Sequence, residues 1–133
     1  MALISVTRLR VRSIRFLPVF LWYSFKSNNQ AKHAPGNFAS TVRAQGSNVF
    51  WTMTVWDSEA SMRSFMRSGS HGKAMPKLQN WCDEASVVHW QAGNATLPTW
   101  AEAETAMITR GRPTPLTHPS IAHQNHQFHY RSR

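Results

Sequence analysis

The sequence predicts an α+β domain of the ferredoxin-like type. The chain has 133 residues, of which 41% are hydrophobic, so it suits one compact domain with a single core. Strand-like alternation and helix-like periodicity follow one another in the order strand, helix, strand, strand, helix, strand within about ninety residues. The single cysteine excludes a disulfide framework and a Cys-rich zinc site, and 16% charged residues exclude a coiled coil.

The first strand and helix are predicted within residues 3–33. Residues 3–12 are rich in aliphatic side chains and alternate between two faces, which is typical of a strand. From residue 14 the apolar positions recur at helical spacing. Pro18 fits the first turn of this helix, which must end before the breaker cluster at residues 35–37.

A hairpin and a second helical region follow. Residues 38–44 and 49–56 read as strands joined by a turn, and the second of them ends in Trp56. Residues 57–59 supply an N-cap and a negative first turn for a helix that ends at Gly69.

A second helical piece runs through Ala74 and Trp81, and we place Pro76 near its start. Residues 86–91 are the last predicted strand. We therefore divide the chain into a ferredoxin-like domain (1–92), a linker with a short helix (93–110) and a flexible tail (111–133).

Charge is concentrated at the two ends of the chain. The formal net charge is +9, with +7 in residues 1–45, −2 in residues 46–104 and +4 in residues 105–133. The nearly neutral centre offers no continuous basic track, and no nucleic-acid-binding motif is present, so we do not expect nucleic acid as a partner.

The N-terminal sequence does not fit a secretory signal. The basic and apolar stretches at residues 8–23 imitate a secretory signal, but the apolar run contains a proline and no A-x-A cleavage site follows. Lys26 ends the run before it could span a bilayer. We expect a cytoplasmic protein with no transmembrane segment, and an amphipathic helix on a membrane surface remains an alternative.

One run of residues resembles a known superfamily. VFWTMTVWDSEASMRSFMRSGSHGKAM, followed by a Trp-containing helix and a VVHW strand, is similar to the antibiotic-biosynthesis monooxygenase-like proteins. The likeness covers residues 3–91 and is greatest to small bacterial proteins akin to spheroidene monooxygenase. It implies a four-stranded antiparallel sheet with both helices on one face, and a homodimer whose sheets pair through the other face into a barrel. Proteins of this superfamily include cofactor-independent oxygenases, haem-using enzymes and binding modules, so the fold does not choose the chemistry.

The first strand places three arginines together. Arg8, Arg10 and Arg12 share the face opposite Leu9 and Val11. If Leu9 and Val11 face the helices, the arginines form a basic pocket on the face that the resemblance assigns to the dimer, suited to a carboxylate or another anion. The alternative is that they pair with Asp83, Glu84 or the acids of a partner subunit.

Two histidines are candidates for chemistry. His71 lies at the break between two helical pieces, where the resemblance places a histidine; it could be a general base or an axial haem ligand, or it could cap a helix. His89 shares a strand face with Val87 and could contact a ligand or be a half-buried histidine with its own partner.

The aromatic side chains complete the predicted site. Trp51 and Trp56 could line a pocket for a planar ligand or fill the core. We expect no metal site, because the tail histidines (His118, His123, His126 and His129) lack the partners and spacing of a zinc centre. Cys82 precedes two acids, which disfavour its thiolate as a nucleophile.

Two functions follow as hypotheses. The first is a monooxygenase-like protein that binds an apolar or anionic small molecule, with haem or with no cofactor. The second is a ligand-binding or dimeric scaffold protein without catalysis.

Overall fold

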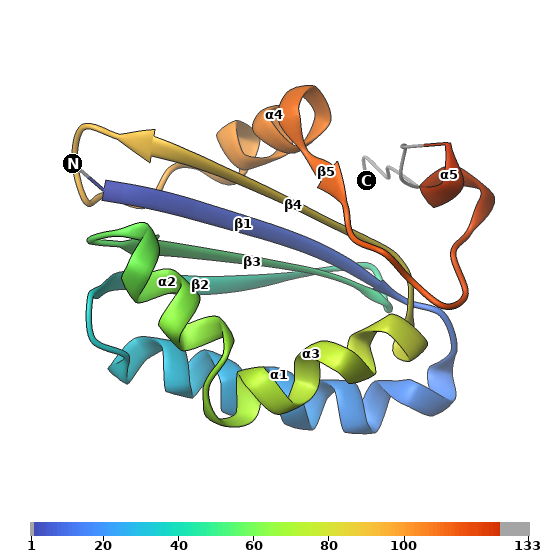
Figure 1. Ribbon diagram of the computed structural model, residues 1–133. Coiled ribbons are helices and arrows are strands. Elements are labelled where there is room, and N and C mark those ends of the chain that lie inside the picture. Colours follow the sequence, from blue (N-terminus) through green and yellow to red (C-terminus); the bar gives the residue numbers. More distant parts are fainter. Residues whose placement is uncertain (1, 126–133) are drawn as a thin grey trace.

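The computed structural model describes residues 2–125, and its elements follow the predicted order (Figure 1). The strands are β1 (Ala2–Val11), β2 (Asn37–Gln45), β3 (Val49–Trp56), β4 (Cys82–Ala92) and β5 (Arg112–Pro113). The helices are α1 (Leu17–His33), which a short 3-10 turn (Ile14–Phe16) precedes, α2 (Glu59–Met66), α3 (Gly69–Trp81), α4 (Trp100–Arg110) and α5 (Ile121–Gln124).

One antiparallel sheet forms the centre of the molecule, with the strand order β2-β3-β1-β4-β5. Its first four strands have the ferredoxin-like arrangement that the sequence predicts. The prediction of four strands is wrong by one, because β5 pairs with β4 through Ser86–Pro113 and Val87–Arg112. A two-residue strand containing proline has no periodicity that a sequence pattern can reveal.

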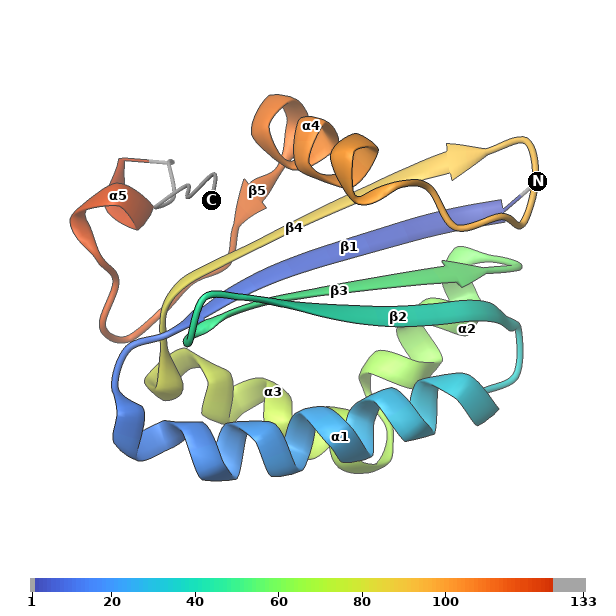
Figure 2. The same ribbon diagram turned by 180° about the vertical axis from the view of Figure 1, so that it is seen from behind.

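Helices cover both faces of the sheet (Figures 1 and 2). On one face lie α1, α2 and α3, where Val11 of β1 packs with Phe20 of α1 and Trp81 of α3. On the other face lies α4, which buries Ala103, Ala106 and Met107 against the sheet in a second core cluster. The sheet therefore has no bare face among the residues described.

The second core cluster contains residues from both sides of position 92. Ile4, Val6 and Met53 are almost fully buried beneath α4. Ala103, Ala106 and Met107 of α4 thus pack in the same cluster as the residues of β1 and β3.

Three further details differ from the prediction. Pro76 lies inside α3 rather than near its start. β4 begins at Cys82, four residues before the predicted strand, because the acidic residues that read as a non-strand segment pair with β1. Residues 112–125, predicted to be flexible, lie along β4, where backbone N–H groups of Thr114 and Ser120 donate to carbonyl oxygens of that strand.

Candidate functional site

The register of the sheet brings four polar side chains into one row on the face covered by α1, α2 and α3. Ser40 lies opposite Thr54, Thr54 opposite Ser5, and Ser5 opposite His89. Residues paired across neighbouring strands point to the same face, so these four form a continuous line across β2, β3, β1 and β4. We call this line the polar row.

The polar row is largely shielded from water. Ser5 and Thr54 are 9% and 7% exposed, and the two outer members are half-buried. Ser40 Oγ donates to Asn28 Oδ1 of α1 at 3.0 Å, and the indole Nε1 of Trp56 donates to Thr54 Oγ1 at 2.7 Å. These bonds connect the row to a helix on one side and to a buried aromatic ring on the other.

His89 is the titratable member of the polar row. Burial lowers the pKa of its imidazole, and the positive charge of Arg112 lowers that pKa further. Glu59 of α2 acts in the opposite direction, while Arg63 adds to the lowering. Within the part of the chain described, neither ring nitrogen of His89 has a hydrogen-bond partner, so a neutral imidazole with an available lone pair lies against the row at neutral pH.

His71 holds the junction between α2 and α3. Its ring packs on Phe65 at 4.5 Å between centroids, and its Nδ1 is 3.1 Å from the carbonyl oxygen of Met66. Its backbone N–H donates to Gln30 Oε1 of α1 at 3.0 Å, while Gln30 Nε2 donates to the carbonyl oxygen of Ser68 at 2.8 Å. Burial lowers the pKa of His71. These contacts support the alternative in which His71 stabilises the helix junction.

Gln30 is a residue that sequence reasoning missed. It lies in the middle of a predicted helix, and its role depends on a contact 41 positions away along the chain. No periodicity or motif marks such a residue.

Two of the three arginines of β1 are paired with carboxylates. Arg8 is 1% exposed and donates to Glu84 Oε1 at 2.7 Å, while Arg10 donates to Glu84 Oε2 at 3.1 Å and lies 3.6 Å from Asp83. Burial lowers the pKa of Arg8, and its bond to Glu84 opposes that effect. The structure therefore favours the alternative in which these arginines pair with acids of β4.

Arg12 lies beyond this cluster. Its Nε donates to the carbonyl oxygen of Asn80 at 2.6 Å, and its guanidinium lies 4.6 Å from the centre of the Phe16 ring. It therefore joins the end of β1 to the end of α3 and does not extend a basic pocket with the other two.

The two candidate tryptophans lie on opposite faces of the sheet. Trp56 packs on Phe65, on the side of the polar row. Trp51 is fully buried beneath α4, where the Arg43 guanidinium lies 5.3 Å from its ring and 4.8 Å from that of Trp100. The residues predicted to bind a ligand are thus divided between the polar row with Trp56, the arginine pair with Trp51, and Arg12 at the end of β1. His71, the predicted catalytic residue, lies apart from them at the junction of α2 and α3.

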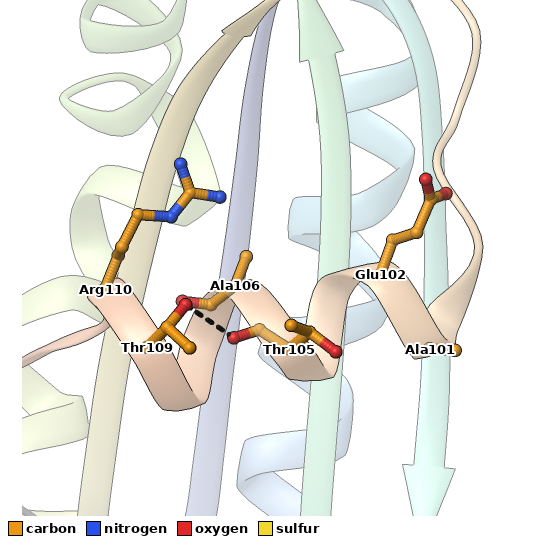
Figure 3. Close-up of a pocket in the computed structure, with 6 residues that line it drawn as sticks. All are labelled: Ala101, Glu102, Thr105, Ala106, Thr109 and Arg110. Carbon is orange, nitrogen blue, oxygen red and sulfur yellow. Dashed lines mark hydrogen bonds between the residues drawn. The ribbon is translucent and has the colours of Figure 1, made fainter.

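A shallow hollow on α4 contains none of the predicted residues (Figure 3). Its volume is about 330 Å³, and it is lined by Ala101, Glu102, Thr105, Ala106, Thr109 and Arg110. Glu102 is engaged in the capping box of α4 with Thr99. The hollow thus brings together no constellation of catalytic groups.

The tail histidines form no metal site within the residues described. His123 is buried and accepts from the backbone N–H of Ala85 at 3.4 Å, while its Nε2 donates to the carbonyl oxygen of Thr114 at 2.8 Å. It anchors the C-terminal segment on β4. His126 and His129 lie outside the described residues.

Comparison with known proteins places the chain in a family. The model of a domain of unknown function, DUF3291, matches residues 18–115. The chain belongs to the DUF3291 family. The matched segment includes α4, in keeping with the contribution of that helix to the core. Among curated proteins, no sequence similar to this DUF3291 chain was found.

Solved structures confirm the antibiotic-biosynthesis monooxygenase-like fold. SnoaB, a cofactor-independent oxygenase from Streptomyces nogalater, superposes with a TM-score of 0.56 at 16% identity, covering 74% of this chain and 98% of SnoaB. An antibiotic biosynthesis monooxygenase gives 0.61 at 12% identity, covering 69% and 99% of the two chains. Rv0793 from Mycobacterium tuberculosis gives 0.63 at 6% identity, covering 71% and 97%. At these identities the similarity concerns the fold alone, and this fold is the one that the sequence resemblance implied.

No helix among the residues described is long and apolar enough to cross a membrane.

Proposed function

We propose that this DUF3291 protein binds a small, largely apolar molecule against the polar row and oxidises it without a cofactor, with His89 as the general base. The observation that carries the proposal is the half-buried imidazole of His89, which has no hydrogen-bond partner within the described residues. Because the described residues occupy neither ring nitrogen and part of the ring is reachable from solvent, this imidazole is available to a molecule that binds against the sheet.

The surroundings of His89 define the class of molecule. Ser5 and Thr54 supply hydroxyl groups in the same row, and the aromatic rings of Trp56 and Phe65 pack on each other beside Thr54. Such a surface suits an aromatic ring that carries phenol or carbonyl oxygens, because the rings pack and the oxygens accept or donate hydrogen bonds.

A neutral imidazole can remove the proton that oxidation requires. An acidic CH₂ group beside a phenol or a carbonyl loses a proton to His89 and becomes a carbanion, which is electron-rich enough to react with O₂ directly. Overall, CH₂ and O₂ give C=O and H₂O, so the substrate supplies the electrons and no external reductant is needed. The lowered pKa of His89 keeps the imidazole in the basic form at neutral pH.

Binding without turnover is the second candidate. It is favoured by the composition of the polar row, in which the three partners of His89 are hydroxyl groups and none is a second titratable group. One basic side chain without an acid in the same row is enough to recognise a ligand, but it provides few groups for acid–base catalysis.

Haem binding at His71 is a separate hypothesis, which one absorption spectrum tests. The Nδ1 of His71 bonds a backbone carbonyl, which leaves Nε2 as the atom that would hold an iron, and the lowered pKa favours the neutral ring. Haem bound there would supply redox chemistry. The absorption spectrum and native mass of the purified full chain therefore come first: a Soret band would replace our proposal, and a bound organic molecule or an empty protein would leave it in place.

The decisive experiment uses an anthrone as the probe, because its CH₂ group is acidic and its oxidised product is coloured. Oxygen uptake and product absorbance are followed with the wild type, His89→Gln and His71→Gln. We expect turnover to fall by about 10²- to 10⁴-fold in His89→Gln and to persist in His71→Gln, provided both fold. Binding of the anthrone without oxygen uptake would favour the second candidate, and an unchanged rate in His89→Gln would refute the base.

The homodimer that the resemblance implies is part of this proposal, and its interface has to accommodate α4. A barrel formed by pairing sheet on sheet uses the face that α4 covers through Ala103, Ala106 and Met107. We therefore propose that a dimer of this chain packs around α4 or displaces it.

A further inference from the structure

The outward side of α1 exposes a cluster of large apolar side chains near its start. Trp22 is 59% exposed and Phe25 is 73% exposed, and Leu21 and Val19 are 48% and 38% exposed. Ile14, in the turn that leads into the helix, is 81% exposed. We call these five residues the α1 patch.

The α1 patch spans the outer half of the helix. At 100° per residue, Trp22 and Phe25 point away from Phe20 and Ala31, which are buried against the rest of the domain, while Val19 and Leu21 lie on the two flanks of that outer surface. Isolated exposed apolar residues are ordinary, but five large ones within twelve positions mark a surface that contacts something apolar.

The helices around the patch carry positive charge and no carboxylate. Neither α1 nor α3 contains Asp or Glu, and these two helices pack side by side (Figures 1 and 2). Their exposed cations, with one from the preceding turn, are Arg15, Lys26, Lys32, Lys73 and Lys77. All six acids of the chain lie outside α1 and α3: Asp57 and Glu59 at the start of α2, Asp83 and Glu84 in β4, and Glu102 and Glu104 in α4 across the sheet.

We propose that the α1 patch docks this protein on an anionic lipid surface. Ile14, Leu21 and Phe25 would enter the boundary between headgroups and acyl chains, and Trp22 would lie at that boundary with the Lys26 ammonium, which already lies 5.1 Å from its ring. The surrounding cations would contact acidic headgroups. The protein lies on the membrane and does not span it.

Lipid fits this surface better than nucleic acid does. Bases stack on aromatic rings, but the aliphatic side chains of Ile14, Val19 and Leu21 offer them nothing to stack on. Hydrocarbon chains accept aliphatic and aromatic groups alike. The combination of aliphatic side chains, tryptophan and lysine is thus typical of a helix in the membrane interface.

The test is co-sedimentation of the full chain with vesicles of phosphatidylcholine alone or of phosphatidylcholine mixed with phosphatidylserine. We expect binding to the mixed vesicles that weakens as salt is raised. The double variant Trp22→Ser/Phe25→Ser should bind at least about tenfold more weakly, and Lys26→Glu should lose roughly fivefold or more. Ile108→Ser on α4 is the matched control, because Ile108 is 61% exposed on the other side of the sheet, and it should bind as the wild type does.

Several results would overturn the proposal. Absence of binding to phosphatidylserine vesicles would do so, as would equal losses in the patch variant and in Ile108→Ser. Sedimentation velocity adds a further arm: a dimer that Trp22→Ser/Phe25→Ser dissociates, without vesicle binding by the wild type, would make the patch an interface between two copies. An RNA that competes fully with the vesicles would assign the surface to nucleic acid. Circular dichroism verifies that each variant is folded, and Lys26→Glu keeps the test open if the double variant is not.

Discussion

The buried pair of Arg8 and Glu84 gives a prediction whose size follows from the structure. Both side chains are almost fully shielded from water, and Arg8 Nη1 donates to Glu84 Oε1 at 2.7 Å. Removing one member of such a pair leaves an uncompensated charge in the interior, which costs about 3–5 kcal/mol. We therefore expect Glu84→Gln to lower the free energy of unfolding by that amount.

Urea denaturation followed by circular dichroism measures the effect. For a domain of this size a slope of roughly 1.5 kcal/mol per molar urea converts the loss into a midpoint lower by about 2–3 M. Arg10 provides the contrast: it donates to Glu84 Oε2 at 3.1 Å and lies 3.6 Å from Asp83, but its side chain is 28% exposed and Glu84 keeps its bond to Arg8 when Arg10 is replaced. Arg10→Gln should cost no more than about 1 kcal/mol.

A double change separates the charge from the packing. Arg8→Met with Glu84→Leu removes both charges and leaves apolar groups of similar size, so it should be far more stable than either single change. Reasoning from the buried pair would be refuted if Glu84→Gln and Arg10→Gln had equal, small effects, or if the double variant were as unstable as the sum of the single ones.

Three smaller predictions use other parts of the domain. Burial raises the pKa of the Cys82 thiol to about 12, with Asp83 adding to the effect, so Cys82 should react with a thiol reagent at neutral pH only after urea unfolds the chain; prompt reaction of the native protein would contradict this. Gln30→Ala removes three hydrogen bonds at the junction of α2 and α3 and should lower the free energy of unfolding by about 1–3 kcal/mol in urea, whereas the exposed Gln79→Ala should change it little. The pKa values of His71 and His89 lie below their usual 6.5 in the folded chain, so the unfolded chain binds more protons and the free energy of unfolding should fall as pH drops through about 6.5. His71→Gln and His89→Gln should each flatten that decline. If both variants had the same pH profile as the wild type, the lowered pKa values would be refuted.

The order of the elements could be predicted because it depends on local patterns. The alternation in β1 and β3 and the helical spacing in α1 are visible in short windows of sequence, and the breaker residues around Gly36 mark where α1 ends. Ser58 caps α2 through a bond from the backbone N–H of Ser61, as the acidic, polar start of that helix suggests.

The site could be predicted only in part because it depends on register. The alternation of β3 separates Trp51 from Trp56, yet nothing local states that Ser5 lies between Thr54 and His89. That neighbourhood arises from pairing across three strands that are far apart in the chain. Arg8 and Glu84 are 76 positions apart in the chain, so the sequence predicts their pairing only as an alternative to a basic pocket.

The structural match takes in nearly all of SnoaB and a smaller share of this chain. SnoaB is covered over 98% of its length, but only 74% of this chain takes part in that match. In this chain α4 covers the face that the superfamily resemblance assigns to the dimer, and the segment around His123 lies on β4 beside the Arg8–Glu84 pair. A ligand that reached that face would have to displace a helix whose Ala103 and Met107 are almost fully buried. On the face covered by α1, α2 and α3, Ser5 and Thr54 are shielded from water as well, whereas His89 is half-buried, so a search for a ligand should begin at the His89 end of the polar row.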